Sequence, residues 1–365
     1  MSSVIEFSKD YNDSIFKESI CKFNESVAHK LDLSKSICLV DLSYLTFTRY
    51  FAMRIWYKNA HPDKNLPDDY DYFSDDIFME KFNLLFHKKV YDICQSLSVP
   101  RENIVYGVDC HHKENWRVKA DKNYKGTRAE SHVKNNFTNF EIFPHVRNNI
   151  LKPIQDDLGN VMLYHPHLEA DDVLALLHNY LRQTKNYKKN IYIIANDKDY
   201  IQLCNPKTHI VDINKKFIGD KHLEQYEEFI KKEKINETYP EITSNIMFLL
   251  AKILMGDISD NIPPCNISTQ FLKDNKLIKN SKKQYSKCTK SLINKLLFNK
   301  NILTEIYKYL VDTRKCLLEN KSLTLSQIDI FENNQFYLNA KFIDFNNIPN
   351  KYQIKMFKIY DCLLK

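Results

Sequence analysis

The sequence predicts an α/β fold, in which a parallel sheet flanked by helices is followed by a smaller α-helical domain. Short β-branched runs that lead to acidic residues alternate with segments of helical periodicity in the first part of the chain. After about Lys231 the strand signal stops and helical periodicity takes over. The length of 365 residues leaves room for two such units, each with a buried core.

Each predicted strand is a short apolar run with acidic residues close behind it. We expect strands at residues 37–40, 104–108, 161–164 and 191–195, and a fifth, shorter one at residues 209–213. Apolar residues at three- and four-residue spacing predict helices between them, at residues 43–56, 78–97 and 171–182. In the helical domain the same spacing predicts helices at residues 241–255, 291–311 and 351–364.

The composition also indicates where the units begin and end. We expect an N-terminal extension at residues 1–34, an α/β core at residues 35–235 and a helical domain at residues 236–365. Residues 58–76 are rich in Asp, Asn and Pro, which is typical of a surface insertion.

The composition excludes several classes of function. The five glycines are too widely spaced for G-x-G-x-x-G or G-x-x-x-x-G-K-[ST], which rules out the usual dinucleotide and Walker-type phosphate loops. Nine cysteines without a C-x-x-C pair indicate free thiols in a reducing compartment and give no support to a structural zinc site. The longest apolar run, residues 246–255, is too short to cross a membrane. The first residues have no leader pattern, so a cytoplasmic or nuclear location is expected.

The acidic residues behind the strands are the strongest functional signal. In an open α/β sheet the reactive site lies beyond the carboxyl ends of the strands. Any one of these acids would more often be a turn residue or a helix cap, and the pair in the turn MGDISDNIP could be a capping turn. The seven acids behind the strands are together hard to explain in that way. They are Asp41, Asp109, Glu169, Asp171, Asp172, Asp197 and Asp199, and the pair in the turn after the helix is Asp257 and Asp260.

Such a concentration of carboxylates predicts a metal site. Crowded carboxylates repel one another and raise one another's pKa, and divalent cations restore their ionisation. Ligands that are all oxygen atoms favour Mg²⁺ or Mn²⁺ over zinc. If the turn with Asp257 and Asp260 folds back over the sheet edge, two ions could share these acids, which is the arrangement used for in-line phosphoryl transfer.

Basic residues accompany the acids. The net charge is +7, and residues 113–134 carry seven Lys or Arg against three acids, with Trp116 and Tyr124 among them. Aromatic rings among cations suit stacking on unpaired bases while the cations hold phosphates, although a solvated basic loop has the same composition. Residues 271–300 hold nine Lys against a single acid, which suits phosphate contacts to a duplex or, again, a solvated face.

Five motifs resemble those of a known family. They are VDLSYL, NYKGTR, EADDVLAL, ANDKDYIQL and KILMGDISDNIP, at residues 40–45, 123–128, 169–176, 195–203 and 252–263. In content, order and spacing they resemble the 5′ nuclease or flap endonuclease superfamily and, within it, the ribonuclease H group of T-even phages. The resemblance covers roughly residues 35–350, and the combination of motifs is highly specific.

The resemblance implies a PIN-like 5′ nuclease core with a helical arch at about residues 111–147. It also implies a helix-three-turn-helix duplex-binding motif at about residues 247–276. Two Mg²⁺ ions would be bound, with Mn²⁺ as a substitute. Asp41, Asp109, Glu169 and Asp171 would hold the first ion, and Asp197, Asp199, Asp257 and Asp260 the second, with Asp172 near both. A K⁺ ion at the duplex-binding motif is doubtful, because no glycine follows Gly256.

The resemblance also suggests roles for the basic and aromatic residues. Lys125 and Arg128 would stabilise the charge that develops on the phosphate, and Tyr124 would stack on the terminal nucleotide. Arg117 would steer the single strand. The complete set of expected nucleic-acid-binding residues is Trp116, Arg117, Lys119, Lys122, Lys273 and Lys276.

The implied activity is that of a structure-specific 5′-3′ exonuclease and flap endonuclease that removes RNA primers or 5′ flaps during DNA replication and repair. Its partners would be branched or nicked duplex DNA with a 5′ flap and RNA–DNA hybrids, and it would act as a monomer during replication of a phage or DNA virus. A membrane is not expected among its partners. Two alternatives stay open, a PIN-type ribonuclease for single-stranded RNA and a non-catalytic nucleic-acid-binding scaffold on a nuclease fold.

A sliding clamp or a single-strand-binding protein is a further candidate partner. Gln353, Met356, Ile359 and Tyr360 loosely fit a clamp-binding peptide. An amphipathic terminal helix has the same spacing of apolar residues.

Overall fold

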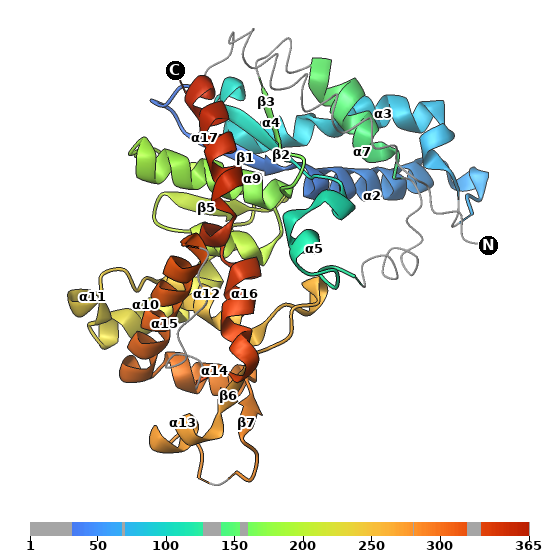
Figure 1. The fold of residues 1–365 in the computed structure, drawn as a ribbon. Coiled ribbons are helices and arrows are strands. Elements are labelled where there is room, and N and C mark those ends of the chain that lie inside the picture. Colours follow the sequence, from blue (N-terminus) through green and yellow to red (C-terminus); the bar gives the residue numbers. More distant parts are fainter. Residues whose placement is uncertain are drawn as a thin grey trace.

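The computed structural model describes residues 31–67, 70–126, 140–153, 160–279, 281–319 and 330–364. Figure 1 shows an α/β unit with its sheet in the upper part of the view and a helical unit below it. The predicted fold class, a parallel sheet with helices and a smaller helical part, is therefore confirmed. None of the described helices is long and apolar enough to cross a membrane.

The central sheet has five strands in the order β3-β2-β1-β4-β5, and every neighbouring pair is parallel. All five lie within a residue or two of the predicted positions. The strand order changes direction between β1 and β4, which is the place where open α/β sheets bind their ligands. The strands are β1 (Ile37–Asp41), β2 (Ile104–Val108), β3 (Val161–Tyr164), β4 (Ile191–Ile194) and β5 (Thr208–Val211).

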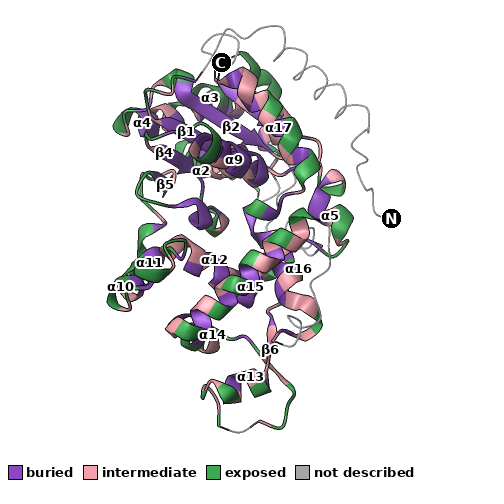
Figure 2. Ribbon diagram, turned by 60° about the vertical axis from the view of Figure 1, so that its left-hand side comes forward, coloured by how far each residue is buried: buried purple, intermediate pink, exposed green. Residues whose placement is uncertain are grey.

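Helices cover both faces of this sheet (Figure 1). On one face, alternate residues of β1 such as Cys38 and Val40 pack against one group of helices. On the other face, Ile37 and Leu39 pack against a second group. Because both faces are covered, β2 and β4 are buried along their whole length, as Figure 2 also shows. The first group is α2 (Leu42–Ala60), α3 (Asp76–Phe86), α4 (Lys88–Ser96) and α7 (Ile142–His145), and the second is α9 (Ala170–Asn179) and α17 (Asn350–Leu363).

Two long predicted helices are each divided in two. Residues 78–97 form α3 and α4, which meet at His87. Residues 291–311 belong to α14 (Lys290–Leu297) and α15 (Lys300–Leu318). Between these two helices, the side chain of Asn299 accepts hydrogen bonds from the first amides of α15. This capping explains why a new helix begins there, although the apolar spacing continues.

The helical unit is built around α12 (Ser244–Met255), whose apolar residues form a core of their own. Among its described residues it contains four helices that the periodicity did not predict, α10, α11, α13 and α16. It also contains an antiparallel pair of short strands, so the expectation that only helices follow Lys231 is wrong. The remaining elements are α10 (Asp220–Lys232), α11 (Ile235–Thr238), α13 (Thr269–Asp274), α16 (Gln335–Ile343), β6 (Asn266–Ser268) and β7 (Tyr285–Lys287).

The segment predicted as the duplex-binding motif runs from α12 through a tight turn and β6 to α13. In Figure 1, β6, β7 and α13 project from the lower end of the molecule. A helix-three-turn-helix motif in this segment stays a prediction.

The C-terminal helix α17 returns to the α/β unit, although the sequence-based division assigned it to the helical domain. Met356 and Tyr360 are fully buried there, and the Tyr360 hydroxyl donates a hydrogen bond to the carbonyl of Val173 in α9 (2.8 Å). The clamp-binding interpretation of this helix is therefore contradicted, because two of its four expected anchors are core residues.

Candidate active site

Three acids meet at the carboxyl edge of the sheet. Asp41 ends β1, Asp109 follows β2, and Asp197 follows β4 at the start of a 3-10 helix at Lys198–Leu203. Parallel strands bring these positions to one edge, beside the point where the strand order changes direction.

Asp41 and Asp109 are held in place by neighbouring donors. Asp41 caps α2 by accepting a hydrogen bond from the amide of Tyr44 (3.0 Å), and its second oxygen accepts one from the Tyr200 hydroxyl (3.2 Å). Asp109 accepts hydrogen bonds from Ser43 and from the amide of Ala170. Burial and the charge of Asp109 raise the pKa of Asp41 to about 7. Burial and the charge of Glu169 raise the pKa of Asp109 as well.

Glu169 and Asp171 lie at the first turn of α9. Glu169 and Asp172 form a capping box, which explains why the helix begins here after the strand β3. Burial would raise the pKa of Glu169, but Lys125 and Arg117 lower it to about 2. Burial raises the pKa of Asp171 well above its usual value, and the charges of Asp172 and Glu169 add to the effect.

Asp172 belongs to a buried network rather than to the open acidic cluster. Its two oxygens accept hydrogen bonds from both terminal nitrogens of the Arg117 guanidinium group, at 2.7 and 2.8 Å. Its Oδ2 also accepts one from the indole nitrogen of Trp116 (2.9 Å). Arg117 and Asp172 are 2 % and 0 % exposed.

This network corrects three sequence-based expectations. Arg117 cannot steer a single strand while its guanidinium group is enclosed between Asp172 and the carbonyl of Phe342. Trp116 is also buried, with its indole nitrogen bonded to Asp172. Asp172 has no oxygen left that is free of these donors, so it does not face the acids as a ligand would. The three residues form a structural support beneath Glu169.

The segment after α5 (Trp116–Ala120) connects the acids of the sheet to the second acidic pair. The hydroxyl of Tyr124 donates to Glu169 (3.0 Å) and to Asp260 (2.9 Å). The Lys125 ammonium group lies 2.5 Å from Glu169 and 3.7 Å from Asp260, and the Lys125 amide donates to the carbonyl of Asp260. The turn with Asp257 and Asp260 therefore reaches the sheet edge, as the sequence analysis required for a shared site. Tyr124 is buried, which contradicts its expected stacking on a nucleotide.

A second lysine occupies the other half of the cluster. The Lys252 ammonium group, on the last turn of α12, pairs with Asp199 and lies 3.0 Å from Asp257. Burial would raise the pKa of Asp257, but Lys252 keeps it below its usual value. The pKa of Asp197 is raised by burial and by the charges of Asp260 and Asp257, although Lys252 opposes the shift.

The remaining predicted residues are spread over the surface. Lys119 is exposed and pairs with Glu114 (2.6 Å), and Lys122 is exposed on the turn before Tyr124. Lys273 and Lys276 lie at the end of α13, away from the acidic cluster (Figure 1). Arg128, together with most of the second half of the predicted arch, lies outside the described residues.

The donor set suits a hard divalent cation. In the described part of the chain, no three His, Cys, Asp or Glu side chains are placed to hold one metal ion, and the ammonium groups of Lys125 and Lys252 lie between carboxylates instead. Even with these lysines, the pKa values of Asp41, Asp171 and Asp197 are raised, by burial first and then by neighbouring carboxylates. Buried carboxylates with uncompensated charge are the groups that a cation would stabilise.

Sequence reasoning missed three contributors to this cluster. Ser43 and Tyr200 each donate a hydrogen bond to a central carboxylate, and both stand within motifs quoted above. Lys252 is also part of a quoted motif, but nothing in the pattern assigned it a role. Its position one helical turn before Gly256 was the available signal, because that spacing brings its side chain to the turn that follows.

Comparisons with known proteins show which family the chain resembles. A family model described as 5′-3′ exonuclease, N-terminal resolvase-like domain, matches residues 36–239, which is more than half of the chain. A curated 5′-3′ exonuclease of Buchnera aphidicola subsp. Schizaphis graminum is 32% identical over 151 residues, which are 41% of this chain and 44% of that protein. The match thus spans less than half the length of that relative.

Solved structures from bacteriophage T5 are also similar. The T5 D15 protein co-crystallised with metal ions has a TM-score of 0.45 at 13% identity, covering 90% of this chain and 96% of that chain. A T5 D15 flap endonuclease variant in a pseudo-enzyme-product complex with DNA and metal ions has a TM-score of 0.44 at 13% identity, covering 90% and 100%. The match of the family model to more than half of the sequence is decisive: the chain belongs to the family that carries the 5′-3′ exonuclease N-terminal, resolvase-like domain.

Proposed function

We propose that this protein is a Mg²⁺-dependent 5′-3′ exonuclease and flap endonuclease that hydrolyses phosphodiester bonds. One observation carries the proposal. Acids from the ends of β1, β2 and β4 and from α9 meet a second acidic pair that the Tyr124–Lys125 segment holds against them. Its role would be the removal of RNA primers or 5′ flaps in replication and repair. A phage or viral source stays a prediction.

Two groups of carboxylates would hold the ions. The ions would supply an activated water molecule and would stabilise the leaving oxygen. Asp172 is omitted, because Arg117 and Trp116 occupy its oxygens. Mn²⁺ would substitute for Mg²⁺, since both prefer oxygen ligands. The first group is Asp41, Asp109, Glu169 and Asp171, and the second is Asp197, Asp199, Asp257 and Asp260.

Lys125 is proposed to bind the reacting phosphate. Its ammonium group already lies between carboxylates of both groups, so a small movement would bring it to a phosphate that approaches the acids. A cation at that position stabilises the charge that develops as the bond breaks. The proposed substrates are duplexes with a 5′ flap and RNA–DNA hybrids.

The first test is the Asp197→Asn variant on a 5′-labelled flap duplex and on a matching RNA-primed duplex. We expect cleavage by the parent with Mg²⁺, none with EDTA, and a loss of at least a hundredfold in the variant. Binding of the duplex should change less than threefold, because the substitution removes a carboxylate and leaves the basic surface intact.

Glu224→Gln is the matched control, since Glu224 is an exposed acid on α10. Cleavage at the parent rate by pure Asp197→Asn protein would refute the assignment. Binding without any cleavage by the parent would favour the scaffold alternative. Cleavage of single-stranded RNA alone would favour the PIN-type ribonuclease.

A further inference from the structure

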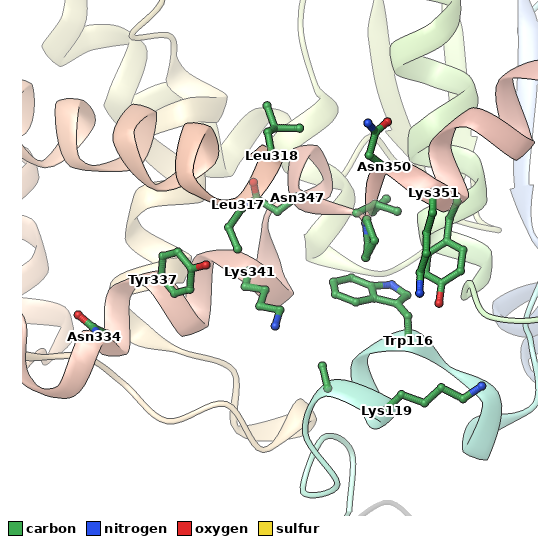
Figure 3. Close-up of a pocket in the computed structure, with 14 residues that line it drawn as sticks. Trp116, Lys119, Leu317, Leu318, Asn334, Tyr337, Lys341, Asn347, Asn350 and Lys351 are labelled. Atoms are coloured by element: carbon green, nitrogen blue, oxygen red, sulfur yellow. The ribbon is translucent and has the colours of Figure 1, made fainter. Parts of the chain in front are cut away.

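A cavity lies beside Trp116, outside the acidic cluster. It has a volume of about 770 Å³ and lies between α5, the end of α15, α16 and the start of α17 (Figure 3). This size is within the range of small-molecule sites. Trp116 joins this cavity to the buried network beneath Glu169, since its indole nitrogen bonds to Asp172 while the residue also lines the cavity.

The charge of the cavity is entirely positive. Lys119, Lys341 and Lys351 line it, and none of the described lining residues is acidic. Lys119 is paired with Glu114, whereas Lys341 and Lys351 form no ion pair with any described residue. The two lysines come from α16 and α17, and Figure 3 shows both beside the ring of Trp116. The cavity therefore suits an anionic ligand.

A flat ring adds a further requirement. Trp116, Tyr337 and Tyr352 line the cavity. Trp116 and Tyr352 are only 4 % and 6 % exposed, whereas Tyr337 is half-buried, so Tyr337 offers the ring surface that a ligand can cover. A ligand with a flat aromatic ring would stack there.

A nucleotide meets both requirements. Its phosphates would pair with Lys341 and Lys351, and its base would stack on Tyr337. We propose that the cavity binds nucleotides of single-stranded nucleic acid, outside the site of hydrolysis. The proposal goes beyond the proposed nuclease activity and requires no metal ion.

The test measures the fluorescence of Trp116, which reports ligand binding in the cavity that it lines. The chain has two tryptophans, and Trp56 lies on α2, so a Trp56→Phe background leaves Trp116 as the single reporter. In EDTA, where no cleavage occurs, a DNA tetranucleotide should change the Trp116 emission in a saturable way. In that background, Lys341→Ala/Lys351→Ala should weaken binding at least tenfold, and Tyr337→Leu should weaken it at least threefold.

Matched controls separate this site from general electrostatic attraction. Lys355→Ala/Lys358→Ala removes two exposed charges from the same helix α17 outside the cavity, and binding should change less than twofold. An abasic tetramer carries the same phosphates without bases. If it binds as tightly as the tetranucleotide, the proposal fails and the cavity is only an anion groove.

Two further ligands settle the identity of the occupant. If adenosine monophosphate changes the Trp116 emission and competes with the tetranucleotide, the proposal is supported. Free nucleotides would then be a second kind of ligand for the cavity. If a peptide of Asp and Phe residues changes the emission and the tetranucleotide does not, the nucleotide proposal is overturned and a protein partner is favoured. Because Asp197→Asn does not touch the cavity, that variant should bind the tetranucleotide normally even if it cleaves nothing.

Discussion

Arg117 is a fully buried cation whose guanidinium group holds both oxygens of Asp172. A charge pair inside a protein is costly to separate, because removal of one partner leaves the other charge buried and unpaired. Arg117 also bonds to the carbonyl of Phe342 in α16, so it links the base of the acidic cluster to the helical unit. Its function is thus to support the site rather than to contact a substrate.

We expect Arg117→Gln to lower the free energy of unfolding by about 3 to 5 kcal/mol, because Asp172 would lose its counter-ion. The double variant Arg117→Gln/Asp172→Asn should lose less than the sum of the two single variants, since no charge then remains buried. Urea denaturation monitored by circular dichroism measures all three. Normal stability of Arg117→Gln together with weaker single-strand binding would instead restore the role assigned from sequence.

At the same scale, the sequence predicted where the acids lie better than it predicted which groups contact them. Acids that follow strands can be recognised because strand direction alone brings them to one edge, as with Asp41 and Asp109. The burial of Arg117 and Tyr124 could not be read from their motif, because a basic and aromatic composition is the same for a solvated loop and for a packed one. Only the tertiary contact with Asp172 and Glu169 distinguishes the two cases.

Among the elements, α17 has two clearly different sides. Met356, Tyr360 and Leu363 are buried against the α/β unit, whereas Ile354 is 51% exposed. The amide of Leu31 also bonds to the carbonyl of Leu363, so the first described residues are held beside this helix. The helix is therefore part of the core, and its removal would damage the sheet unit.

The expected cost of Met356→Ala is about 2 to 5 kcal/mol of unfolding free energy, because a buried side chain would leave a cavity. Ile354→Ala on the same helix should cost less than about 0.5 kcal/mol, since that side chain is largely in water. Urea midpoints for the two variants provide the comparison. Equal, small effects would mean that α17 is detached in solution, and the clamp interpretation would then return.

The success of prediction also differed between kinds of element. Strands of the parallel sheet were found because they are apolar throughout and end in acids, whereas β6 and β7 have three residues each and show too little alternation to be recognised. Helix α16 was missed although its buried face, with Phe336 and Ala340, packs on α12. Its apolar residues are interrupted by polar ones that bond to neighbouring segments, such as Asn339 to the carbonyl of Pro263 in the loop after α12.

In the whole molecule, a second buried side chain besides Arg117 joins the two units. Gln202 donates to the carbonyl of Ile343 (3.0 Å), and its own oxygen accepts from the amide of Phe345 (3.0 Å). Its backbone carbonyl accepts from Asn245 at the start of α12 (2.8 Å). These bonds fix the helical unit against the sheet, which is necessary because the acidic pair Asp257 and Asp260 comes from the helical side.

The charge of the whole chain should make duplex binding sensitive to salt, because bound cations are released from DNA when lysines contact its phosphates. The variant Lys273→Ala/Lys276→Ala should bind a duplex more weakly at low salt. The slope of log affinity against log salt should also be flatter by about two. Fluorescence anisotropy at several salt concentrations measures this slope.

The control for this prediction is Lys231→Ala/Lys232→Ala, which removes two exposed lysines from the end of α10 and should leave the slope unchanged. If both double variants flatten the slope equally, DNA contacts the whole basic surface rather than the projecting α13 region.

The two lysines within the acidic cluster have a final consequence. Lys125 and Lys252 each lie between two carboxylates, so the protein carries its own counter-ions. Uptake of a divalent ion would then be an exchange of one cation for another, with little change in the local charge balance. The chain could then fold and persist in a solution poor in magnesium. An ammonium group displaced in the exchange would stay beside the acids, at the place where an incoming phosphate arrives.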